Sequence, residues 1–200
     1  MHATTPNTLI LFGPQVPRLI PSYLAELRAI FSDPDFSFLF EVVKELPLLW
    51  PLIRDSWDPL QHLPGQEQLK QLQNYFETGE LLQVEPPSNI ILAPLTVLAQ
   101  VAEYLRLGRT GNTQGFCVGF LAAAVVASAQ SETELQQFTA AAVKVAVCIG
   151  AAIDLDKVDL DPQDRSFAYS VHWTSTAQKK YFEKTLGSFP RVSFFLTCHR

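Results

Sequence analysis

The chain has 200 residues, of which 48% are hydrophobic and 18% charged, and its formal net charge is −5. This length and composition are typical of one globular domain with a sizeable core, and they argue against a disordered chain or two separate domains. The acidic balance and the scattered Lys and Arg residues argue against nucleic acid as a partner.

Apolar runs at helical spacing alternate with short β-rich runs along the chain. Pro47 is expected to end the second helix, and Gly79 and Gly108 to follow the ends of two later ones. Strands and helices in alternation predict an α/β fold. The expected elements are a strand over 8–13, helices over 19–31 and 36–46, an irregular connection over 50–65, helices over 66–78, 90–107, about 116–128 and 131–153, an acidic loop over 154–164, a strand over 166–173, a helix over 174–186 and a strand over 192–197.

Two helices carry clear start signals. Ser88 and Asn89 precede the long apolar helix, where Ser or Asn side chains cap the first free N–H groups. Ser131 and Glu134 form the S-x-x-E pattern of a capping box at the start of the last long apolar helix.

The three cysteines, Cys117, Cys148 and Cys198, lack metal-like spacing and cannot all pair within the chain. A reducing compartment is the simpler interpretation. The N-terminus lacks the pattern of a signal peptide, and the longest uninterrupted apolar run, Phe116 to Ala127, has 12 residues, too few to cross a bilayer. These features predict a cytoplasmic protein.

Cys117 lies between two glycines in Gly115-Phe116-Cys117-Val118-Gly119, the G-x-S-x-G pattern of a nucleophile elbow with Cys in place of Ser. In an elbow the nucleophile occupies a strained strand-to-helix turn, so the residues two positions away must be small. The N–H groups of the following helix favour a thiolate and an oxyanion. The pentapeptide alone also fits a buried Cys in a small-residue helix. By contrast, Cys148 in VAVCIG is expected in the core and Cys198 is incidental.

Longer segments carry a resemblance to a known family. LILFGPQVP, ILAPLTVLAQVAEYL, TQGFCVGFLAAAVVASA and SETELQQFTAAAVKVAVCIGAAID together resemble the starter-unit acyltransferase domain of fungal non-reducing polyketide synthases. The resemblance covers nearly the whole chain. It implies an acyltransferase-like, α/β-hydrolase-type core with a nucleophile elbow, followed by the start of a small ferredoxin-like subdomain.

By this resemblance, Cys117 takes an acyl group from an acyl-CoA or acyl-phosphopantetheine thioester, or from a fatty acid synthase, and passes it to an acyl carrier protein. The backbone N–H groups of Gln15 and Val118 would form the oxyanion hole. Pro14, in FGPQ, stands where the family more often has a polar residue. No bound cofactor and no metal are implied.

The position where malonyl-type acyltransferases carry a carboxylate-binding Arg, about 25 residues past the nucleophile, is Ala142, and the nearest cation is Lys144. An unpaired carboxylate in an apolar pocket is costly. We therefore expect an uncharged acyl group.

The family's catalytic His follows the nucleophile by well over a hundred residues, whereas this chain ends 83 residues after Cys117. We expect a single partial domain over 1–200, with a larger subdomain over about 1–164 and the start of a smaller one over about 165–200. Its four histidines do not match the base position: they are His2, His62, His172 and His199.

Three interpretations stay open: a thiol acyltransferase, a non-catalytic truncated remnant or interaction module, and an α/β hydrolase with a Cys nucleophile, which lacks a plausible His. Lys179, Lys180 and Lys184 fall on one polar helix and suit an acidic carrier protein, although a solvated helix face is the commoner explanation.

Overall fold

The computed structural model describes residues 9–15, 21–80, 82, 88–108, 111–158 and 175–186. Two compact units, Met1–Leu160 and Asp161–Arg200, divide the chain, and each is described by itself.

The first unit contains two short strands and most of the helices. They follow one another as β1 (Leu9–Phe12), α1 (Pro21–Phe31), η1 (Pro34–Phe36), α2 (Ser37–Ser56), η2 (Asp58–His62), α3 (Gly65–Thr78), α4 (Asn89–Arg106), β2 (Asn112–Gly115), α5 (Gly119–Ser128) and α6 (Glu132–Val158).

The second unit contains α7 (Thr176–Leu186), which agrees with the predicted polar helix except for its first two residues. The strands predicted over 166–173 and 192–197 lie outside the described residues. The division into two subdomains at residue 164 therefore stays a prediction.

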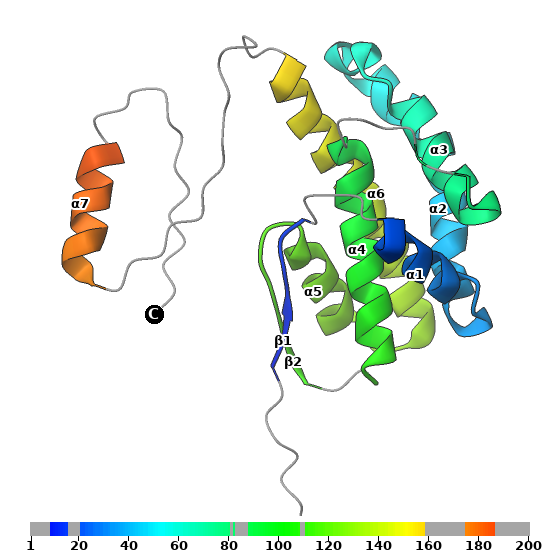
Figure 1. Cartoon of the computed structure of the whole chain (residues 1–200), viewed down its shortest axis with the longest axis horizontal. Coiled ribbons are helices and arrows are strands. Elements are labelled where there is room, and N and C mark those ends of the chain that lie inside the picture. The colour runs from blue at the N-terminus through cyan, green and yellow to red at the C-terminus, as the bar shows by residue number, and fades with distance from the viewer. Residues whose placement is uncertain are drawn as a thin grey trace, which may run out of the picture. The chain divides into compact units, whose positions relative to one another are not determined.

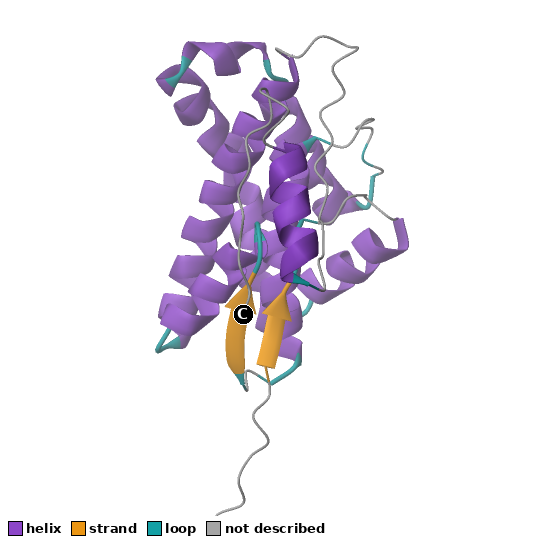
Figure 2. Ribbon diagram, turned by 90° about the vertical axis from the view of Figure 1, so that its left-hand side faces the viewer, coloured by secondary structure: helices purple, strands orange, loops and turns teal. Residues whose placement is uncertain are grey.

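The two strands form a parallel pair, which Figure 2 shows side by side and pointing the same way. Leu9 pairs with Asn112 and Phe12 with Gly115, so both strands end at the same edge. A mostly helical unit with a parallel pair is consistent with the predicted α/β class. The first strand agrees with the prediction, whereas the run before Cys117 was not assigned to a strand.

The core is centred on α4, which is buried along nearly its whole length. It packs against α3, α5 and α6, and lies between α1–α3 on one side and the strand pair with α5 on the other (Figure 1). Its start is capped as predicted, because Ser88 Oγ accepts from Ile90 N at 3.1 Å. Gly79 likewise ends α3 as predicted, with a left-handed φ of 82°.

The predicted end of the second helix at Pro47 is wrong, because α2 continues through Pro47 and Pro51 to Ser56. Pro51 has no N–H to donate to the carbonyl of Pro47, four residues earlier. Gln66 Nε2 from α3 donates to that oxygen instead, at 3.0 Å. Tertiary packing also holds this part of α2, since Trp50 is 1% exposed.

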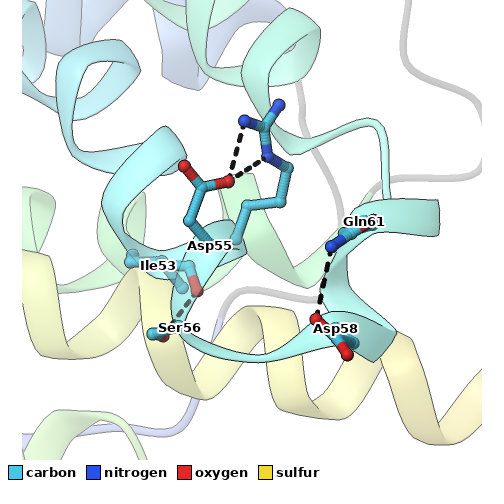
Figure 3. Close-up of polar contacts among 6 residues, drawn as sticks. Ile53, Asp55, Ser56, Asp58 and Gln61 are labelled. Carbon is cyan, nitrogen blue, oxygen red and sulfur yellow. Dashed lines mark hydrogen bonds and ion pairs between the residues drawn. The ribbon is translucent and has the colours of Figure 1, made fainter.

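The irregular connection predicted over 50–65 is correspondingly shorter. Figure 3 shows how α2 ends: the Ser56 hydroxyl donates to the Ile53 carbonyl at 2.6 Å, and the chain turns into η2. In η2, the Gln61 amide donates to Asp58 at 3.4 Å (Figure 3).

α6 begins at the predicted capping box. Glu134 N donates to Ser131 Oγ at 3.2 Å, and Glu134 Oε2 accepts from Gln130 N at 2.7 Å. The helix continues to Val158, so the first residues of the predicted acidic loop, 154–158, are helical. Cys148 is exposed rather than in the core, because it lies on the solvent side of α6.

Within the described residues, one helical segment, Glu132–Leu155 of α6, has the length and apolar composition of a membrane span. This is weak evidence for a membrane protein, because a core helix passes the same test. Here α6 packs against α4, and Val143, Ala146 and Val147 of α6 are fully buried in the core.

Candidate functional site

Cys117 lies on the turn between β2 and α5. Its φ is 57°, and it is the one non-glycine residue of the described chain with a positive φ. This left-handed conformation is strained for a residue with a Cβ atom. Because β2 ends at Gly115 and α5 begins at Gly119, the turn has the strand–turn–helix geometry of a nucleophile elbow.

The two glycines of the pattern lie where backbones touch. A Cβ atom on Gly115 would lie 2.4 Å from the carbonyl oxygen of Gly119, and one on Gly119 would lie 2.3 Å from that of Gly13. Both distances are far below van der Waals contact. The glycines therefore allow the start of α5 to pack directly on the ends of β1 and β2.

In the turn that leads into α5, three backbone amides have backbone acceptors. Gly119 N donates to Phe116 O, Phe120 N to Cys117 O and Leu121 N to Val118 O, each at 3.0 Å. Within the described residues, the N–H of Val118 donates to no acceptor. That N–H belongs to the residue directly after Cys117.

The loop 13–15, which carries Gln15, begins at the same sheet edge. Phe12 pairs with Gly115 in the register, and Phe116 N donates to Phe12 O at 3.0 Å. The residues after both strands are therefore neighbours, at the edge where parallel sheets hold their ligands. Pro14 leaves the N–H of Gln15 in place.

Two side chains of α4 hold loop 13–15. Gln100 Nε2 donates to the Gly13 carbonyl at 2.8 Å, and Asn89 Oδ1 accepts from Gln15 Nε2 at 2.6 Å. Asn89 was predicted only as a possible helix cap, and Gln100 was not singled out. Local sequence carries no signal for these contacts, because they join residues 87 and 74 positions apart.

The residues that flank Cys117 in the sequence are apolar and, apart from Val118, largely exposed. Cys117 itself is exposed, as are Phe116 at 50% and Phe120 at 65%, whereas Val118 is buried.

In the described part of the chain, the position and the cation singled out from the sequence lie on α6. Ala142 is buried in α6, and Lys144 Nζ makes an ion pair with Glu45 of α2 at 2.7 Å. Of the four histidines, His62 lies in the described part, exposed at the end of η2, and the other three fall outside it. Among the residues described, no group of His, Cys, Asp and Glu is arranged to hold a metal.

The second cysteine of the described chain differs from Cys117. Although Cys148 is exposed as a residue, its thiol is partly removed from water, and this desolvation raises the pKa of the thiol above the ordinary value. A raised pKa lowers the thiolate fraction and hence the reactivity at neutral pH. Cys148 therefore provides an internal control for Cys117.

Comparison with known proteins identifies the class to which this fold and elbow belong. Residues 34–191 match the family described as "Starter unit:ACP transacylase in aflatoxin biosynthesis". The chain is 37% identical over 186 residues to the non-reducing polyketide synthase adrD of Penicillium rubens, covering 90% of this chain and 7% of that protein.

Two further relatives are also fungal synthases. Identity is 32% to the non-reducing polyketide synthase nvfA of Aspergillus novofumigatus, over 94% of this chain and 8% of that protein. It is 29% to the 5-methylorsellinic acid synthase of Aspergillus terreus, over 91% of this chain and 8% of that protein. The chain thus spans less than a tenth of the length of these relatives. It belongs to the starter unit:ACP transacylase family of fungal non-reducing polyketide synthases.

Proposed function

We propose that the chain accepts a starter acyl group on Cys117 and passes it to an acyl carrier protein. The Cys117 thiolate attacks the carbonyl carbon of the donor thioester, so a carbon–sulfur bond forms and the carbonyl oxygen takes the electron pair. When the intermediate collapses, the bond to the donor sulfur breaks, and the CoA thiolate leaves and takes a proton from water. The carrier's phosphopantetheine thiolate then attacks the acyl group and releases the Cys117 thiolate.

The observation that carries this proposal is the φ of 57° at Cys117 between two glycines that no larger residue can replace. Strain of this kind persists where the surrounding structure holds it, and it is typical of active sites. The N–H of Val118, which has no acceptor among the described residues, supports a role in the oxyanion hole, with the N–H of Gln15 from the neighbouring loop as the second donor.

The acyl group of this proposal is uncharged. A malonyl carboxylate needs a cation, and Lys144 is already paired with Glu45 on α2. The exposed Phe116 and Phe120, which lie one and three residues from Cys117 in the sequence, favour an alkyl chain instead.

The finer structural expectations belong to the same proposal. We assign the first unit to the larger, α/β-hydrolase-type subdomain and the second to the smaller, ferredoxin-like one. Either a CoA thioester or a fatty acid synthase would serve as donor. A cytoplasmic location fits, because reducing conditions keep Cys117 as a thiol.

The test is the intact mass of the protein after incubation with acetyl-CoA, hexanoyl-CoA or malonyl-CoA. We expect one acyl adduct from the two uncharged donors and none from malonyl-CoA. The adduct should vanish in Cys117→Ala and persist in the matched control Cys148→Ala, because Cys148 is exposed but lies within a regular helix.

A second candidate function is a non-catalytic interaction module, favoured by the absence of a histidine next to Cys117 among the described residues. A thiolate depends less on a base than a serine hydroxyl does, so self-acylation does not require one. Folded protein without any adduct would support the non-catalytic module and overturn the acyltransferase proposal.

A further inference from the structure

A chain of polar side chains joins loop 13–15 to the end of α6. Gln15 Nε2 donates to Asn89 Oδ1 at 2.6 Å, and Asn89 Nδ2 donates to Asp154 Oδ1 at 2.5 Å. Asp154 Oδ2 accepts from Ser88 Oγ at 2.5 Å and from Ile90 N at 3.2 Å. The side-chain amide of Asn89 thus accepts a hydrogen bond from Gln15 of the loop through its oxygen and donates one to the carboxylate of Asp154 through its nitrogen.

Asn89 is fixed in place by its surroundings. It is buried, and buried polar groups are costly unless they are hydrogen-bonded. Its own backbone is held as well, because a Cβ atom on Gly150 would lie 2.1 Å from the Asn89 carbonyl oxygen. α6 therefore passes the start of α4 at backbone contact, and the Asn89 side chain projects from a rigid base.

Two side chains on the same face of α4 hold loop 13–15. Asn89 and Gln100 are eleven residues apart, about three whole turns of α4, so both amides lie on the same side. Gln100 holds the carbonyl of Gly13, and Asn89 holds the side chain of Gln15. Open space lies above Gly13, since a Cβ atom there would meet nothing within 4 Å. The two amides therefore supply the described side-chain hydrogen bonds from α4 to this loop.

We propose that Asn89, oriented by Asp154, is a positioning residue that holds Gln15 so that its backbone N–H stays aimed at the oxyanion formed during acylation of Cys117. This inference rests on the proposed function. Its physical reason is that an oxyanion hole works through preorganised donors, and an unheld loop would have to be ordered at each turnover.

The test compares two reactions of Cys117 in the full chain, each followed on the Cys117 peptide by mass spectrometry. Acylation by hexanoyl-CoA passes through an oxyanion. Alkylation by iodoacetamide does not, because the thiolate displaces iodide and forms a sulfur–carbon bond directly. The ratio of the two rates reports the oxyanion hole, independently of the reactivity and exposure of the thiol.

Two variants break the contact. Gln15→Ala removes the loop side chain but keeps its N–H, and Asn89→Asp places a second carboxylate against Asp154. Each should slow acylation by about tenfold or more and leave alkylation within about twofold, since loss of one oxyanion donor costs 10²–10³.

Exchanging the amide and the carboxylate between positions 89 and 154 should restore the acylation rate. In Asn89→Asp/Asp154→Asn, the new amide donates to the new carboxylate, which still accepts from Gln15, and Ser88 and Ile90 keep an acceptor. Acylation should return to within about threefold of wild type if each hydrogen bond reforms. Ser131→Ala, which weakens the cap of α6 far from the loop, is the control for destabilisation alone and should leave the rate ratio unchanged.

The outcomes separate the two proposals. If wild type is acylated and Gln15→Ala is acylated equally fast, the role of Asn89 is overturned while the acyltransferase stands. If Ser131→Ala lowers the rate ratio as strongly as Gln15→Ala does, the effect is general destabilisation and the role of Asn89 is again overturned. If wild type is alkylated but never acylated, the proposed function falls, and the role of Asn89 with it.

Discussion

At the scale of single residues, Cys117 carries the strain of the elbow, and this strain can be measured without any substrate. In an ordinary helical conformation Gly is less stable than Ala by about 1 kcal/mol. At a φ of 57° the order should reverse, because a left-handed conformation costs a residue with a Cβ atom about 1–2 kcal/mol. We therefore expect Cys117→Gly to be more stable than Cys117→Ala by up to about 1 kcal/mol in urea unfolding.

The matched control is the same pair of substitutions at Cys148. This residue lies within α6, so Cys148→Gly should be less stable than Cys148→Ala by about 1 kcal/mol. Opposite signs at the two cysteines would establish the strain. If Gly were the less stable residue at both positions, the turn at Cys117 would be relaxed and the elbow geometry wrong.

The elbow could be predicted from sequence because its requirements are local: five consecutive residues contain the nucleophile and both glycines. The hydrogen bonds that Asn89 accepts from Gln15 and donates to Asp154 could not be predicted, since they join residues 74 and 65 positions apart. No local pattern distinguishes an Asn that caps its own helix from an Asn that bonds a distant loop. Asn89 was therefore predicted only as a helix cap. Cys148 was misplaced because an apolar run on α6 does not say which side faces solvent.

At the scale of elements, helix ends marked by a cap or a glycine were predicted well, as at Ser88, Gly79 and Ser131. The end of α2 was predicted wrongly, because a proline inside a helix normally ends it and α2 contains two. The reason it continues is tertiary: Gln66 of α3 donates to the Pro47 carbonyl that Pro51 leaves without a helical partner. Such a compensation cannot be seen from the helix's own sequence.

That compensation predicts coupling between Gln66 and Pro51. Gln66→Leu should cost about 1–3 kcal/mol of unfolding free energy, because it leaves the buried Pro47 carbonyl without a donor. Pro51→Ala supplies a backbone N–H four residues after Pro47, so Gln66→Leu should cost less in that background. Urea unfolding of wild type, both single variants and the double variant measures the difference. Effects that add to within about 0.5 kcal/mol would mean that Gln66 does not compensate for Pro51.

At the scale of the whole molecule, the described hydrophobic core runs from Phe12 to Leu155 and so lies inside the first unit. The described part of the sheet is too small to be stable alone, since it is one parallel pair with Leu9 and Leu11 exposed. The sheet is supported by α5, which packs on both strands. α5 in turn packs against α4 and α6. The elbow therefore depends on a helical core that the first unit contains by itself.

A fragment of residues 1–160 should consequently fold alone. We expect a cooperative thermal transition within about 4 °C of the full chain, because a loss of 1 kcal/mol shifts the melting temperature of a chain this size by about 2–4 °C. A fragment ending at residue 130 is the control. It lacks α6 and with it core residues such as Val143, Val147 and Leu155, so it should show no cooperative transition. If the 1–160 fragment also melted without cooperativity, residues 161–200 would be part of the folding unit. The assignment of the first unit to a separate subdomain would then be wrong.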